Sequence, residues 1–147
     1  MDNKAADGKG PRIVCVEAPG DAAAEVAARL ADHVAAEFGP RDEKPLSVFA
    51  YDEAGALIAG LNGATHWRWL YVRNLWTAPE LRGRGLAGRV LGEAELKARE
   101  RGCIGVYIDT FDPAAGAFYE KRGFARFGTN PDFPPGAQRI FLAKRLG

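Results

Sequence analysis

Glycine and arginine are concentrated in one segment, residues 79–91, which reads PELRGRGLAGRVL. Its glycines let the backbone turn tightly and approach a ligand closely, because no Cβ stands in the way. An apolar, β-prone stretch precedes this Gly/Arg segment, and a helical pattern follows it. The N–H groups in the first turn of a helix lack intrahelical partners, and the helix dipole adds about half a positive charge there. The segment therefore predicts an anion site suited to a pyrophosphate.

Two common phosphate-binding motifs fit the Gly/Arg segment poorly. A Walker-type loop ends in Gly-Lys-Ser/Thr, and residues 79–91 contain no Lys, Ser or Thr. Residues 83–88 do match the string G-x-G-x-x-G of dinucleotide-binding folds, but that motif follows the first strand of a doubly wound sheet. Here it follows the fourth predicted strand. A dinucleotide-binding protein is therefore the less favoured alternative.

The composition limits the classes of protein to consider. With 147 residues, 47% of them hydrophobic, one domain over residues 11–147 is expected, and the polar, aperiodic residues 1–10 are expected to be disordered. Twenty basic and nineteen acidic residues argue against a general nucleic-acid or membrane-surface binder. No signal-peptide pattern and no apolar run of roughly 20 residues is present. These features predict a cytoplasmic protein with neither nucleic acid nor membrane as partner.

Hydrophobic periodicity and turn residues predict the order of the elements. An early helix of about 17 residues carries one apolar stripe, Val26, Leu30, Val34 and Phe38, with Asp21 as its N-cap. The predicted elements are, in order, a strand at 12–17, this helix, hairpin strands at 46–51 and 56–61, a long strand at 67–77, a helix from 86 that ends at Gly102, a strand at 103–108, a short helix through Lys121 capped by Asp112, a strand at 123–127, a loop at 128–137 and a strand at 139–146.

A strand, a Gly-rich turn, a helix and a second strand within about 40 residues predict a parallel βαβ unit. Together with the early hairpin and the late strand pair, they predict an α/β (mixed α+β) fold: a mixed, largely antiparallel sheet flanked by helices. Alternation along residues 67–77 predicts a central strand covered on both sides, with Leu75 on one face and Trp76 on the other. Cys15 and Cys103 lie in apolar runs and are expected to be buried free thiols rather than disulfide or metal ligands.

Two segments resemble the motifs of the GNAT superfamily of N-acetyltransferases. Residues 82–87, RGRGLA, are similar to its R/Q-x-x-G-x-G/A motif, and residues 112–124, DPAAGAFYEKRGF, resemble its N-x-x-A-x-x-x-Y-E-K-x-G-F motif. The ending at residues 144–146 also resembles that of family members. The likeness covers residues 45–147 well, and residues 12–40 only in the order of elements. Two motifs in the right order are far more specific than either alone.

The resemblance implies that acetyl-CoA, or another acyl-CoA, is the acyl donor and that a primary amine of a small molecule or peptide is the acceptor, with no metal. Family members often form homodimers through their C-terminal strands, although this sequence gives no independent sign of a homodimer. By the resemblance, backbone N–H groups of residues 84–87 hold the CoA pyrophosphate, and the end of the strand at 67–77 pairs with the pantetheine arm. The implied cofactor-binding residues are Leu75, Trp76, Thr77, Arg82, Gly83, Arg84, Gly85, Leu86, Ala87, Asp112 and Ala115.

Tyr119 is the implied catalytic residue. It matches the family tyrosine whose hydroxyl lies near the CoA sulfur and can protonate the leaving thiolate. Because a free phenol has a pKa of about 10 and a thiol about 8.5, a hydrogen bond to the developing thiolate is the safer expectation. Asp112 stands where the family commonly has Asn, so the amide donor of the usual pantetheine contact is missing, and Asp112 is equally suited to cap the short helix.

The sequence does not identify a general base. Many family members place a Glu on the central strand, and residues 67–77 contain no carboxylate. His66, Tyr71, Asn74 and Asp109 are candidates for a water relay, and catalysis by positioning with a solvent-relayed proton is the preferred hypothesis. The missing carboxylate also motivates an alternative function, a non-catalytic module that binds or senses acyl-CoA.

Overall fold

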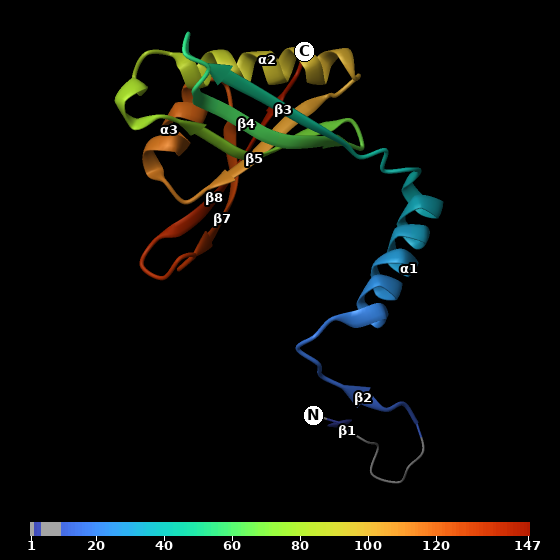
Figure 1. The fold of residues 1–147 in the computed structure, drawn as a ribbon. Coiled ribbons are helices and arrows are strands. Elements are labelled where there is room, and N and C mark those ends of the chain that lie inside the picture. The colour runs from blue at the N-terminus through green and yellow to red at the C-terminus, as the bar shows by residue number, and fades with distance from the viewer. Residues whose placement is uncertain (1, 4–9) are drawn as a thin grey trace. The chain divides into compact units, whose positions relative to one another are not determined.

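The computed structural model describes residues 2–3 and 10–147 (Figure 1). The chain divides into two compact units, Met1–Pro40 and Arg41–Gly147, which are described separately. Most of the segment that we predicted to be disordered, residues 1–10, lies outside the described residues.

The described residues of the N-terminal unit form two short strands and a helix. Strand β1 (Asp2–Asn3) pairs antiparallel with β2 (Ile13–Val14), so the strand predicted at 12–17 is only two residues long. Helix α1 (Gly20–Phe38) is present as predicted. The predicted cap is wrong: Pro19 occupies the N-cap position, no side chain caps the helix, and Asp21 lies in its first turn. Among the described residues of this unit, the apolar stripe of α1 is not buried.

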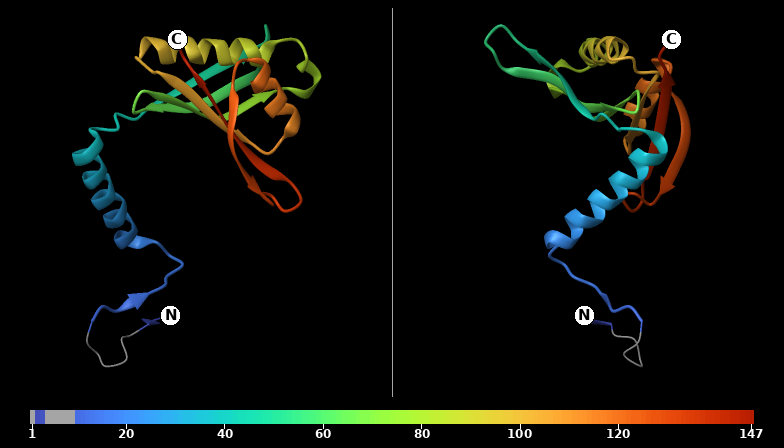
Figure 2. Two further views of the ribbon diagram at one scale, coloured as in Figure 1. Left: turned by 180° about the vertical axis from the view of Figure 1, so that it is seen from behind. Right: turned by 90° about the vertical axis from the view of Figure 1, so that its right-hand side faces the viewer.

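The second unit is built on a mixed sheet of six strands in the order β3-β4-β5-β6-β8-β7 (Figures 1 and 2). Neighbouring strands are antiparallel except for the parallel pair β5 and β6. This arrangement confirms the predicted mixed sheet with a central βαβ unit, β5-α2-β6. The strands are β3 (Lys44–Tyr51), β4 (Leu57–His66), β5 (Trp69–Thr77), β6 (Gly105–Thr110), β7 (Ala125–Pro131) and β8 (Gln138–Arg145), and the helices are η1 (Pro79–Leu81), α2 (Leu86–Glu100) and α3 (Pro113–Lys121).

The core lies between α2 and one face of the sheet. The apolar stripe predicted for this helix is buried at Val90, Leu91, Ala94 and Ala98. These side chains share one cluster with residues of the central strands and of the segment around α3, namely Leu61, Leu70, Val72, Val106, Ile108, Tyr119, Phe124, Ile140 and Leu142. Gly102, with a φ of 80°, ends the helical segment as predicted, because this left-handed conformation favours glycine.

A β-bulge interrupts the pairing of β4 with β5. Asn62 pairs with Asn74, but Gly63 pairs with Val72, so Arg73 is an extra residue in β5. A bulge reverses the alternation of side chains beyond it. Leu75 consequently packs against the core on the same side as Val72, whereas Trp76 is 46% exposed. The faces predicted for the end of this strand from simple alternation are therefore wrong.

The parallel pairing of β5 with β6 is short. It covers four residue pairs, from Trp69 with Gly105 to Val72 with Ile108, and stops there. Both strands continue, β5 as far as Thr77 and β6 as far as Thr110. Among the described strands, the last five residues of β5 therefore have no partner on the side of β6. We call the point where the two strands part the strand separation.

Several predicted boundaries shift. Strand β4 extends to His66, and the turn that follows uses Trp67 and Arg68, both with positive φ, so β5 begins at Trp69 rather than at 67. Strand β7 continues to Pro131, which shortens the loop predicted at 128–137. Cys103 is a buried free thiol, as predicted, whereas Cys15 is exposed, so the prediction that Cys15 is buried is wrong.

The bulge can be tested by adding a methyl group to Gly63. A Cβ there would lie 2.2 Å from the carbonyl oxygen of Tyr71, a backbone atom of the paired strand, so the strands must shift. We expect Gly63→Ala to lower the free energy of unfolding by about 1–3 kcal/mol, as overpacking does. Urea unfolding measures this effect.

Gly92→Ala is the matched control. A Cβ at Gly92 would meet only an Arg122 nitrogen at 4.0 Å, and alanine favours the helix by up to about 1 kcal/mol. Equal stability of the Gly63→Ala variant and the wild type would contradict the bulge geometry.

Candidate functional site

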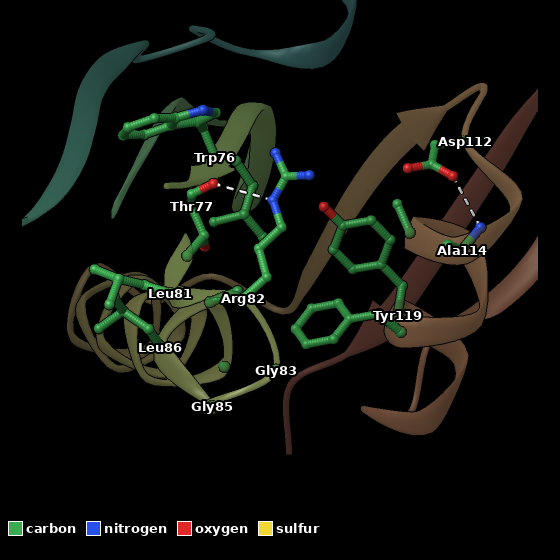
Figure 3. A pocket seen from close by; sticks show the side chains of 15 residues that line it. Trp76, Thr77, Leu81, Arg82, Gly83, Gly85, Leu86, Asp112, Ala114 and Tyr119 are labelled. Carbon is green, nitrogen blue, oxygen red and sulfur yellow. Dashed lines mark hydrogen bonds between the residues drawn. The ribbon is translucent and has the colours of Figure 1, made fainter. Parts of the chain in front are cut away.

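A cleft of about 670 Å³ opens between the end of β5 and the Gly/Arg segment on one side and α3 on the other (Figure 3). Its volume lies within the range of small-molecule sites, roughly 300–1,000 Å³. The lining residues are Leu75, Trp76, Thr77, Leu81, Arg82, Gly83, Gly85, Leu86, Ala87, Gly88, Asp112, Ala114, Ala115, Phe118 and Tyr119.

The cleft brings together nearly all of the site residues predicted from sequence. The exception is Arg84, which is not among the lining residues. Four further residues that the sequence did not predict also line the cleft: Leu81, Gly88, Ala114 and Phe118. The last two could have been found, because Ala114 and Phe118 repeat the four-residue spacing of Ala115 and Tyr119 along α3 and so extend the same face.

The N-terminus of α2 supplies unpaired donors at the cleft. Gly83 and Gly85 both have a φ of 80°, which places Gly85 in the left-handed region as the N-cap residue. No side chain caps α2, and its first turn contains no acidic residue. The N–H groups of this turn and the positive end of the helix dipole are therefore available to an anion.

Arg82 connects the Gly/Arg segment to β5. Its Nε donates a hydrogen bond to the carbonyl oxygen of Thr77 at 3.2 Å (Figure 3). This bond fixes the guanidinium beside the open end of β5. The Nη atoms point into the cleft (Figure 3), where they can donate to an anionic ligand.

Tyr119 is held rigidly by aromatic neighbours. The residue is 5% exposed and packs edge-on against Phe118 and Phe124, with ring centroids 5.3 and 5.5 Å away. Its hydroxyl points into the cleft (Figure 3). Burial, and secondarily the charge of Asp112, raises the pKa of Tyr119 to about 12. The phenol therefore keeps its proton at neutral pH and acts as a hydrogen-bond donor.

Asp112 caps α3, as one of the two sequence interpretations predicts. Its Oδ1 accepts a hydrogen bond from the N–H of Ala114 at 2.9 Å (Figure 3). This bond fixes the start of the helix that carries Ala115 and Tyr119 into the cleft.

The two helical walls of the cleft are linked by Arg122, which the sequence analysis did not single out. The Nη2 atom of Arg122 donates to the carbonyl oxygen of Gly88 in α2 at 3.0 Å. The backbone carbonyl oxygen of Arg122 accepts a hydrogen bond from Lys144 Nζ at 3.1 Å. Lys144 in turn donates to Glu95 Oε2 of α2 at 3.0 Å, and the Glu95 side chain is 7% exposed. These bonds fix the distance between α2 and α3, and hence the width of the cleft.

Of the four candidates for a water relay, Tyr71 and Asp109 are hydrogen-bonded to each other, whereas His66 and Asn74 lie at other positions of the sheet. His66 is half-buried at the end of β4, and its Nε2 lies 2.9 Å from the hydroxyl of Tyr107. Burial lowers its pKa, with a further contribution from the charge of Arg41, so the ring is neutral at pH 7. Tyr71 instead bonds to Asp109, whose carboxylate also pairs with Arg139. Asn74 is exposed beside the bulge.

Residues 2–3 and 10–147 contain no group of three or more His, Cys, Asp or Glu side chains that could hold a metal ion. Among the helices in the same ranges, none is long and apolar enough to cross a membrane.

Comparison with known proteins places these features in a family. Residues 15–124 match the model of the acetyltransferase (GNAT) family. An acetyltransferase of Agrobacterium fabrum is 39% identical over 128 residues, which covers 86% of this chain and 93% of that protein. Blasticidin-S acetyltransferase of Streptomyces morookaense is 40% identical over 109 residues, covering 71% and 80% of the two chains.

A solved structure agrees with these matches. The crystal structure of an acetyltransferase from Agrobacterium tumefaciens superimposes with a TM-score of 0.81 at 34% sequence identity, covering 91% of this chain and 98% of that chain. The resemblance inferred from residues 82–87 and 112–124 is thus confirmed by the family match, the curated relatives and the fold. The chain belongs to the GNAT family of acetyltransferases.

Proposed function

We propose that this acetyltransferase moves the acetyl group of acetyl-CoA to the primary amine of a small molecule. The observation that carries the proposal is the position of Tyr119. Its buried, protonated hydroxyl points into a cleft whose other wall is a helix N-terminus with unpaired donors. An anion site and a fixed hydroxyl donor in one cleft suit a ligand with a pyrophosphate at one end and a thioester at the other.

Each part of the donor has a suitable counterpart in the cleft. The pyrophosphate binds to the backbone N–H groups of residues 84–87, with the guanidinium of Arg82 beside them. The pantetheine arm pairs with residues 75–77, the open end of β5, in the manner of an added strand. Ala115 and Asp112 line the opposite wall. In this arrangement Arg84 contributes its N–H, and its side chain is a minor contact.

The reaction requires a neutral amine and a stabilised leaving group. The amine nitrogen forms a bond to the thioester carbonyl carbon, the C–S bond breaks, and the nitrogen loses a proton to solvent. With a phenol pKa of about 12 and a thiol pKa of about 8.5, full proton transfer from Tyr119 to the thiolate would cost about 5 kcal/mol. Tyr119 therefore stabilises the departing sulfur by donating a hydrogen bond and keeps its own proton.

The relatives support a small-molecule acceptor. One curated relative carries the name of the antibiotic that it acetylates, and its identity to this chain is 40%. The proposed function is tested by incubating the protein with acetyl-CoA and a panel of alkylamines, polyamines, amino acids, aminoglycosides, blasticidin S and peptides. Free thiol and acetylated product are then measured. Acetyl-CoA binding by calorimetry with no product from any amine would instead support the non-catalytic acyl-CoA-binding module.

Tyr119→Phe removes the hydroxyl and keeps the ring that packs on Phe118 and Phe124. We expect kcat to fall about tenfold or more, because one hydrogen bond to developing negative charge is worth roughly 1.5–3 kcal/mol. The Kd for acetyl-CoA should stay within about twofold. Steady-state kinetics and calorimetry measure the two quantities. Tyr51→Phe, at a residue 60% exposed in β3, is the control and should match the wild type. An unchanged kcat in the Tyr119 variant would overturn its role.

Arg82→Met and Arg84→Met separate the two arginine side chains of the Gly/Arg segment. Arg82 lines the cleft and is fixed by Thr77, whereas Arg84 is not a lining residue. We expect the Arg82 variant to weaken acetyl-CoA binding about tenfold and the Arg84 variant by less than about threefold, because a charge-assisted contact contributes more than a distant exposed charge. Calorimetry at two salt concentrations gives both values. A larger loss at Arg84 would contradict the proposed arrangement of the donor.

A further inference from the structure

A second group of polar side chains lies on the face of the sheet opposite the core. Two buried pairs of the parallel register, Leu70 with Val106 and Val72 with Ile108, face the core beneath α2. The pair between them, Tyr71 with Tyr107, must face the other way because side chains alternate along a strand. The two tyrosine rings are stacked, with centroids 4.8 Å apart.

Asp109 and Arg139 belong to the same face. Asp109 follows Tyr107 by two residues in β6, and it pairs in register with Phe141 of β8. Arg139 precedes Phe141 by two residues, which puts it on the same side of the sheet. Tyr71, Asp109 and Arg139 thus come from three different strands. We call these three side chains the Tyr-Asp-Arg group.

The Tyr-Asp-Arg group lies at the strand separation. The last parallel pair is Val72 with Ile108, and Asp109 is the next residue. The cleft lies on the other face of the sheet. Leu75 of β5 lines it, and so does Asp112, which follows β6. The strand separation therefore has the cleft on one side and the Tyr-Asp-Arg group on the other.

Hydrogen bonds fix the direction of the Tyr71 hydroxyl. It donates to Asp109 Oδ1 at 3.0 Å, and Arg139 Nε donates to Asp109 Oδ2 at 2.6 Å. The carboxylate is only 13% exposed, and the guanidinium of Arg139 stacks over the ring of Phe133 with its Cζ 4.7 Å from the centroid. Burial, the hydrogen bond and the charge of Asp109 raise the pKa of Tyr71, so the phenol keeps its proton. With that proton directed at Asp109, the lone pairs of the phenol oxygen remain free to accept.

The surrounding charges favour an uncharged nitrogen. The guanidinium of Arg73, in the bulge, lies over the Tyr71 ring with its Cζ 5.8 Å from the centroid. The Tyr71 side chain thus has two guanidinium groups, those of Arg73 and Arg139, and one carboxylate, that of Asp109, around it. A net positive environment disfavours an ammonium ion and lowers the pKa of a bound amine. The neutral amine, which is the form that attacks a thioester, would therefore be the form held here.

We propose that Tyr71 binds the acceptor amine, its phenol oxygen accepting an N–H of the neutral amine at the strand separation, with Asp109 and Arg139 as positioning residues. This inference rests on the proposed N-acetyltransferase function. It explains how a central strand without a carboxylate serves the reaction: the residues around the acceptor shift the amine toward its neutral form, and solvent takes the proton. The amine therefore approaches the thioester of acetyl-CoA from the face of the sheet opposite the cleft.

The test uses the amine of the panel that the wild type acetylates fastest. Tyr71→Phe keeps the stacked ring and removes the acceptor oxygen, so KM for the amine should rise about tenfold, as expected for one lost hydrogen bond. KM for acetyl-CoA should be unchanged. The control is Tyr107→Phe, which removes a hydroxyl bonded to His66 on the same face and should leave both KM values unchanged.

The positioning role of Asp109 is tested by a double-mutant cycle. Asp109→Asn alone should raise KM for the amine, but it should add less than about twofold in the Tyr71→Phe background, because Asp109 acts through the phenol. Four results would each overturn the inference while leaving the acetyltransferase function intact. The first two are an unchanged KM for the amine in Tyr71→Phe and an equal rise of that KM in Tyr107→Phe. The other two are a matching rise in KM for acetyl-CoA in Tyr71→Phe and additive effects of Tyr71→Phe and Asp109→Asn. If the wild type acetylates no amine of the panel, both this inference and the proposed acetyltransferase function are refuted.

Discussion

One extra residue in β5 determines the geometry on which the site depends. Arg73 has no counterpart in β4, and the two strands accommodate it by a register shift at Gly63. Glycine is required there because the carbonyl oxygen of Tyr71 occupies the position that a Cβ would take. Beyond the bulge, Leu75 turns into the core, and β5 continues without β6 as a partner. An open strand end beside a helix N-terminus is the physical basis of the cleft.

The rest of the second unit holds the two walls of that cleft in place. Arg122 connects α3 to the first turns of α2 through the carbonyl of Gly88, and Lys144 connects the same region to the buried Glu95. Breaking a buried ion pair costs more free energy than breaking an exposed one. These bonds therefore resist widening of the cleft. The donor side therefore combines unpaired N–H groups with a fixed width. On the face of the sheet opposite the cleft, the hydroxyl of Tyr71 has a direction fixed by Asp109 and can accept a hydrogen bond. Such a group suits an amine rather than CoA.

Much of the fold and most of the donor side could be predicted from the sequence because they depend on local signals. The glycines of residues 83–88, the helical periodicity after them and the cap at Asp112 act over a few residues, and each is present in the structure. The βαβ unit follows from their order. The motif that contains Tyr119 carried the family resemblance, which the comparisons confirm.

Features that depend on pairing between distant residues could not be predicted. Simple alternation misplaced Leu75 and Trp76, because a bulge is defined by the register with another strand. The link from Arg122 to Gly88 and the bond from Tyr71 to Asp109 join residues 34 and 38 positions apart, and neither has a local pattern. The N-cap predicted at Asp21 failed because Pro19 and Gly20 start α1 earlier.

The most direct measurement of the central claim is a crystal structure of the protein with acetyl-CoA or a non-hydrolysable thioether analogue. The account predicts that the pyrophosphate lies on the N–H groups of residues 84–87, that pantetheine follows residues 75–77, and that the sulfur lies about 3–3.5 Å from the Tyr119 hydroxyl. The acetyl group should then point through the strand separation toward Tyr71. Density for the analogue outside the cleft, or a sulfur remote from Tyr119, would contradict it.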